Sequence, residues 1–179
     1  MLRTILIFGL AAGAVVALPM NLMMIFGQPG HGSHSMVTGY LVMLLALSLT
    51  FVGVKRHRDR ALGGVIRFLP ALLMGLGISV VASVIYALAW EITLHATHFA
   101  FIDDYSRAMI AAARAKGASA EKLASLSAEM ETFRAQYANP LFRLPMTFVE
   151  IFPVGVLVSV VTAGLLRNSR FLPMKLTPA

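Results

Sequence analysis

Four long apolar stretches dominate the pattern of hydrophobic and polar positions, at residues 4–26, 36–54, 69–101 and 141–166. About 20 apolar residues in a helix cross a hydrocarbon core of about 30 Å, because each residue adds about 1.5 Å. A helix also satisfies its own backbone hydrogen bonds, as lipid requires. The pattern therefore predicts an all-α, polytopic membrane protein with four transmembrane helices in a single domain, residues 1–179.

A polar segment at residues 103–139 separates the third stretch from the fourth and has the pattern of two helices. Asp103 or Asp104 is suited to cap the first helix. Gly117 is suited to end it, and Ser119 to cap the second. Apolar residues of the second helix recur at steps of three and four and form one stripe: Leu123, Leu126, Met130, Phe133 and Tyr137. We predict a helical hairpin whose stripe packs on its own first helix, on the bilayer surface or on another subunit.

Small residues at four-residue spacing occur in the first and third stretches: Gly9 and Gly13, and Gly75, Ser79 and Ser83. Such residues let helix backbones approach closely. We therefore expect these two faces to pack against each other.

The fourth stretch begins with a helix-start signal, Asn139 followed by Pro140. Inside this stretch, Pro153 has no N–H to donate to the carbonyl of Val149. The helix is therefore expected to kink near Glu150.

Composition supports a membrane protein and excludes several other classes. The chain is 58% hydrophobic and 13% charged, whereas roughly a quarter of the residues are charged in an ordinary soluble domain. It has no cysteine, which excludes disulfides, thiol nucleophiles and cysteine-bound metal centres. It has no phosphate-binding glycine loop, serine hydrolase motif or kinase signature, so the motifs predict no enzyme activity.

Basic residues flank the apolar stretches, which is typical of membrane orientation and not of nucleic-acid binding. They precede the first stretch and follow the second and fourth, whereas residues 27–35 contain no Lys or Arg. The positive-inside rule then places both termini in the cytoplasm of a bacterial inner membrane and the 103–139 segment in the periplasm. The basic run after the second stretch is expected to be a loop that faces anionic lipid head groups: Lys55, Arg56, Arg58 and Arg60.

Two acidic residues fall inside predicted spans, where an ionisable side chain is costly and indicates a functional site. With outer boundaries at residues 99 and 141, Glu91 and Glu150 would both lie about 12–14 Å below the interface. Neighbouring carboxylates at one depth could share a proton and couple it to transport. Alternatively, each carboxylate is satisfied by a neighbouring polar group and locks helix packing.

Glu91, His95 and His98 share one helical face, and a carboxylate with two imidazoles can bind a divalent metal. His31 and His34 lie in the first loop on the same side of the membrane, and methionines that flank this loop would favour copper. Alternatively, the histidines form a hydrogen-bonded mouth of the bundle without metal.

Four segments resemble a bacterial membrane-protein family catalogued as domain of unknown function 4199. They are Gly53-Val-Lys-Arg-His-Arg-Asp59, Phe101-Ile-Asp-Asp-Tyr105, Tyr137-Ala-Asn-Pro-Leu-Phe-Arg143 and Thr147-Phe-Val-Glu-Ile-Phe-Pro-Val-Gly155. The family pattern likewise has a glutamate followed by Phe-Pro-Val-Gly. The resemblance implies four spans with a helical insert before the last, and it implies no activity.

Three functional hypotheses follow. The first is a small ion- or proton-coupled permease that uses Glu91 and Glu150 and can assemble as a homo-oligomer. The second is a membrane-embedded metal-binding protein or metalloenzyme that uses Glu91, His95 and His98. The third is a noncatalytic scaffold that recruits a partner through the apolar stripe of its periplasmic hairpin.

Overall fold

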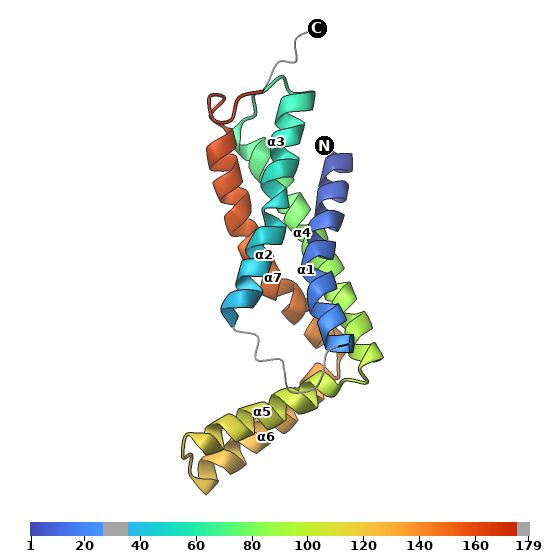
Figure 1. Ribbon diagram of the computed structural model, residues 1–179, viewed down its shortest axis with the longest axis vertical. Coiled ribbons are helices and arrows are strands. Elements are labelled where there is room, and N and C mark those ends of the chain that lie inside the picture. The colour runs from blue at the N-terminus through green and yellow to red at the C-terminus, as the bar shows by residue number, and fades with distance from the viewer. Residues whose placement is uncertain (27–35, 175–179) are drawn as a thin grey trace.

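In the computed structural model of the chain, residues 1–26 and 36–174 are described, and every regular element in these ranges is helical. The helices are α1 (Leu2–Phe26), α2 (Met36–Leu47), α3 (Leu49–Ala61), α4 (Phe68–Ala96), α5 (Ala100–Ala115), α6 (Ala120–Tyr137) and α7 (Pro140–Leu166) (Figure 1). The predicted all-α class is confirmed.

Four segments are long and apolar enough to cross a membrane: Leu2–Pro19, Gly39–Ala61, Phe68–Ala96 and Pro140–Leu166. The second combines α2 and α3, which are separated only by a turn at Ser48. Helix α3 continues through the basic run at residues 55–60 and ends at Ala61. The expectation that this run forms a loop is therefore wrong.

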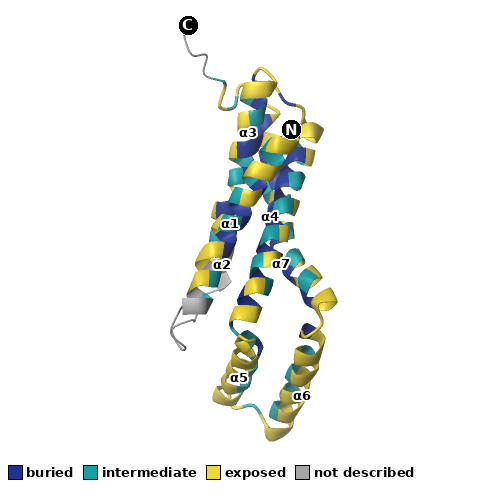
Figure 2. Ribbon diagram, turned by 90° about the vertical axis from the view of Figure 1, so that its right-hand side faces the viewer, coloured by how far each residue is buried: buried dark blue, intermediate teal, exposed yellow. Residues whose placement is uncertain are grey.

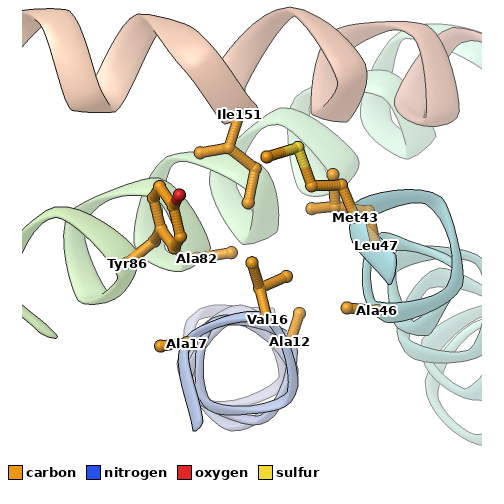
Figure 3. Packing of buried hydrophobic residues seen from close by; sticks show 9 residues of the cluster. All are labelled: Ala12, Val16, Ala17, Met43, Ala46, Leu47, Ala82, Tyr86 and Ile151. Carbon is orange, nitrogen blue, oxygen red and sulfur yellow. The ribbon is translucent and has the colours of Figure 1, made fainter. Parts of the chain in front are cut away.

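The spanning helices pack around α4, which contacts α1 on one side and α7 on the other (Figure 1). Buried positions follow the inner sides of these helices, whereas most outward positions are exposed (Figure 2). One buried apolar cluster joins four helices (Figure 3): Ala12, Val16, Ala17, Met43, Ala46, Leu47, Ala82, Tyr86 and Ile151. Large apolar side chains cover much of the outside, as expected of a surface that faces lipid.

Glycines set the closest helix contacts. A Cβ atom added to Gly9 would lie 2.5 Å from Cβ of Val81 in α4, and one added to Gly13 would lie 2.7 Å from Cβ of Ile85. The glycine face of α1 therefore packs on α4, as expected from its spacing. The small-residue face of α4 packs on α7, because a Cβ on Gly155 would lie 2.6 Å from Cβ of Ser79. The expectation that the two small-residue faces pack against each other is therefore wrong.

The chain turns sharply after the third span. α4 ends at Ala96, and His98 (φ 50°) and Phe99 (φ 61°) adopt left-handed backbone conformations before α5 begins at Ala100. The predicted third span, residues 69–101, is therefore too long at its end. Asp103 lies in the first turn of α5 and is not its cap.

α5 and α6 lie side by side and extend obliquely from one end of the bundle (Figure 1). Gly117 (φ 76°) lies in the turn between them, and the Ser119 side chain caps α6 by accepting a hydrogen bond from the Lys122 N–H at 3.2 Å. An ion pair between Asp103 and Arg134 (3.2 Å) joins the two helices. The predicted end signal and cap are therefore correct.

The last span begins as its sequence predicts. The Asn139 side chain accepts a hydrogen bond from the Leu141 N–H at 3.0 Å, and Pro140 occupies the first turn of α7. The ribbon of α7 changes direction near its middle (Figure 1), the part of the helix that contains Pro153.

Candidate functional site

An arginine and a glutamate form a two-pronged ion pair between α7 and α4. Nε of Arg143 lies 2.5 Å from one carboxylate oxygen of Glu91, and Nη2 lies 2.6 Å from the other. The Arg143 side chain is 4% exposed and that of Glu91 is 18% exposed. Both carboxylate oxygens of Glu91 are therefore engaged by one guanidinium in a largely desolvated setting.

The same guanidinium also binds the end of α6. Nη1 of Arg143 donates to the carbonyl of Tyr137 at 3.1 Å and to that of Ala138 at 2.8 Å. Its carbon centre lies 5.2 Å from the ring centroid of Phe99, which precedes α5. Arg143 of α7 thus contacts α4, the end of α6 and the turn before α5, and we call Arg143 and Glu91 the charged joint.

A second polar contact lies beside the charged joint. The indole N–H of Trp90 donates to the phenol oxygen of Tyr137 at 2.7 Å, and Thr147 is a further hydrogen-bonding partner of that phenol. Thr147 also donates to the carbonyl of Arg143 at 2.9 Å. Burial raises the pKa of Tyr137 above its ordinary value, so the phenol stays neutral and keeps these contacts.

Glu150 has a different environment from Glu91. It is exposed, and the phenol of Tyr86 donates a hydrogen bond to its carboxylate. None of the ion pairs formed within the described residues includes it. The expectation that Glu91 and Glu150 share a proton is not met, because each has its own partner.

The pairing of α4 with α7 explains this separation. Ser79 lies opposite Gly155, and Glu91 lies opposite Arg143, in one antiparallel register. Glu150 follows Arg143 by seven residues, which places it about 10 Å further along α7. The equal depth predicted from residues 99 and 141 was wrong because α4 ends at Ala96, whereas α7 begins one residue before the assumed boundary.

The predicted metal ligands that the structure describes do not form one cluster. Glu91 is engaged by Arg143, and Nδ1 of His95 lies 2.8 Å from the carbonyl of Glu91, where it bonds to its own helix. His98 is exposed in its left-handed turn, and His31 and His34 lie outside the described residues. Within residues 1–26 and 36–174, no three His, Asp or Glu side chains are placed to hold a divalent metal or copper together.

The basic run is partly used inside the protein. Arg58 is fully buried, and its guanidinium donates to the carbonyls of Phe171 (3.0 Å) and Leu172 (2.5 Å) and to Asp59 (2.7 Å). Lys55 pairs with the same Asp59 at 2.5 Å. Arg58 is thus not lipid-facing, which corrects the expectation for the run: Lys55 is half-buried, and only Arg56 and Arg60 are exposed.

Arg143 is the residue that the sequence reasoning missed. It lies two residues inside the predicted fourth span, where an unpaired arginine is as costly as an unpaired glutamate. The candidate groups predicted inside the spans were acids and histidines. Pairing Glu91 with a basic residue near the same membrane interface would have identified Arg143.

No curated protein and no solved structure matches the chain. The family model described as a protein of unknown function, DUF4199, matches residues 7–168 and so covers most of the sequence. The four apolar spans, with two helices inserted before the last, agree with the architecture expected from that resemblance. The chain therefore belongs to the DUF4199 family.

Proposed function

We propose that this protein is a small proton-coupled permease in which Glu150 takes up and releases the proton. The supporting observation is the environment of that carboxyl. Glu150 follows Pro140 by ten residues, so it lies about 15 Å along α7, near the middle of a hydrocarbon core of about 30 Å. An exposed carboxyl with a phenol partner at this depth can exchange a proton, and such a position is costly without a function.

The remaining polar groups support a one-carboxylate mechanism. Glu91 holds the guanidinium of Arg143 through both oxygens, so it is a structural counter-charge and not a second proton carrier. Tyr86 of α4 belongs to the buried cluster that it forms with residues of α1, α2 and α7 (Figure 3). The hydrogen bond from its phenol links the Glu150 carboxylate to that cluster. Helix bending at Pro153 can change this contact during a transport cycle.

The orientation belongs to the same proposal. Basic residues at both ends of the chain and in the last turns of α3 support a cytoplasmic position of the termini in a bacterial inner membrane. α5 and α6 then extend into the periplasm. The acids and arginines that cover this pair suit an aqueous setting.

Proton uptake into proteoliposomes that contain a pH-sensitive dye tests the proposal. A potassium gradient with valinomycin makes the interior negative, and the wild-type protein is expected to acidify it. Glu150→Gln should reduce the initial rate at least tenfold. Glu131→Gln, which neutralises an exposed acid of α6, should keep the wild-type rate. Gel filtration verifies that each variant is folded. No uptake by the wild type, or equal uptake by Glu150→Gln, would refute the proposal.

A scaffold is the second candidate, because the charged joint holds the α5–α6 pair firmly to the bundle. The apolar stripe of α6 does not support the predicted docking surface, since its members are half-buried or buried and α5 packs alongside. A partner would instead contact the exposed polar faces. Deletion of residues 106–136 separates the two candidates. If the deletion abolishes the function of the protein in cells and Glu150→Gln does not, the result supports the scaffold.

A further inference from the structure

The end of the bundle where α1 begins and α7 ends carries a set of exposed arginines that we call the arginine collar. Its members come from four segments of the chain: Arg3, Arg56, Arg60, Arg67, Arg167 and Arg170. α3, the start of α4 and the end of α7 meet at this end (Figure 1). These charges therefore lie around one end of the molecule and not along one helix.

The protein itself does not neutralise this charge. Asp59 is the only acid in residues 1–90 and 151–179. Its carboxylate is already engaged by Lys55 at 2.5 Å and by Arg58 at 2.7 Å. Within the described residues, Asp59 is thus the one acidic residue at this end of the bundle, and none of its ion pairs includes a member of the arginine collar.

The buried Arg58 brings parts of the arginine collar together. Its bonds to the carbonyls of Phe171 and Leu172 attach the end of α3 to the segment that follows α7. The rings of Phe51 and Phe171 meet edge to face at 6.3 Å, which strengthens the same attachment. Arg56 and Arg60 are thus held on a scaffold shared with the segment that contains Arg167 and Arg170.

We propose that the arginine collar binds the head groups of anionic phospholipids in the membrane that the bundle spans. Its members lie within about two turns of the ends of the spanning helices, the depth at which lipid phosphates occur. A guanidinium can engage a phosphate through two parallel hydrogen bonds, which a single ammonium cannot do. From the predicted basic run, Arg56 and Arg60 thus belong to the lipid site, whereas Lys55 and Arg58 bind groups of the protein itself.

Binding of fluorescent phosphatidylglycerol to the purified protein in a neutral detergent tests this proposal, with phosphatidylcholine of the same acyl chains as the comparison. Phosphatidylglycerol should bind more tightly, and added salt should weaken it. One basic residue near an anionic surface contributes about 1 kcal/mol, or about fivefold in affinity. Arg56→Gln with Arg60→Gln should therefore weaken binding about 25-fold.

The matched control is Arg107→Gln with Arg114→Gln, which removes the same charge from α5 at the other end of the molecule. This variant should bind phosphatidylglycerol like the wild type. Three outcomes overturn the proposal: equal affinity for the two lipids, an equal loss in the control, and displacement of the lipid by millimolar inorganic phosphate. The last would identify a site for free anions. None of these measurements depends on proton uptake through Glu150.

Discussion

Arg143 shows how a full charge is accommodated at the edge of a spanning helix. Desolvation of a guanidinium costs several kcal/mol, which only well-placed acceptors offset. Arg143 has four: two carboxylate oxygens of Glu91 and the carbonyls of Tyr137 and Ala138. Because these acceptors belong to different helices, the charge that must be satisfied also determines how the helices meet.

Replacing the arginine alone is therefore expected to lower the free energy of unfolding more than replacing both members of the ion pair. Arg143→Met leaves the carboxylate of Glu91 without its partner, which should lower the free energy of unfolding by about 3 kcal/mol. Adding Glu91→Met removes the unpaired charge and should restore part of this loss. Unfolding in mixed micelles with increasing dodecyl sulfate measures the wild type, Arg143→Met, Glu91→Met and the double variant. Simple additivity of the two single changes would contradict a direct interaction.

Trp90 is the only tryptophan of the chain, so its fluorescence reports on one hydrogen bond. Tyr137→Phe leaves the buried indole N–H without this acceptor, at a cost of about 1–3 kcal/mol. We expect its emission to shift to shorter wavelength. In the wild type, emission should stay constant as the pH passes about 10, the ordinary tyrosine value, because burial raises the pKa of Tyr137. Tyr105→Phe, an exposed phenol of α5, is the control and should leave the emission unchanged.

At the scale of elements, glycines set the spacing of helices where their missing side chains leave room. Gly155→Ala would place a methyl group 2.6 Å from Cβ of Ser79, so α4 and α7 would have to separate. Overpacking of this kind costs about 1–3 kcal/mol. Gly164→Ala is the control within the same helix, because its added Cβ would meet nothing within 4 Å. Thermal unfolding in detergent should show a lower midpoint for the first variant alone, and equal midpoints would contradict the close packing.

The helices themselves could be predicted from the sequence, because lipid demands long apolar runs and caps mark their ends. Asn139 and Ser119 cap α7 and α6 as their side chains indicate. The end of α4 was missed because His98 and Phe99 carry no breaking signal, although they adopt left-handed conformations. The apolar run continues through this turn, and hydrophobicity alone does not distinguish a bent chain from a straight one.

The relation between Glu91 and Glu150 could not be predicted for a different reason. It depends on the register of α4 against α7, and a shift of two turns changes which side chains meet. That register is established by close contacts such as Ser79 with Gly155, which depend on tertiary packing. The sequence identified both carboxylates as candidates and did not determine their partners.

At the scale of the whole molecule, the two ends of the protein differ in their charged residues. Seven of the eight acidic residues lie between residues 91 and 150, whereas the arginine collar occupies the opposite end of the bundle. Such asymmetry supports a single orientation in the membrane, because basic segments stay on the cytoplasmic side. It also places the charged joint and the α5–α6 pair on the side proposed to face the periplasm.

The absence of cysteine allows this orientation to be tested with single thiols. Ser127→Cys introduces an exposed thiol on α6, and Ser169→Cys introduces one after α7. In intact spheroplasts, a membrane-impermeant maleimide should label the first variant and should label the second only after the membrane is opened. Val161→Cys lies on the exposed apolar face of α7, where lipid should protect it from the charged reagent in both conditions. The reverse pattern for Ser127→Cys and Ser169→Cys would place the arginine collar outside the cell, and the carboxylate of Glu150 would then have to exchange its proton from the opposite side.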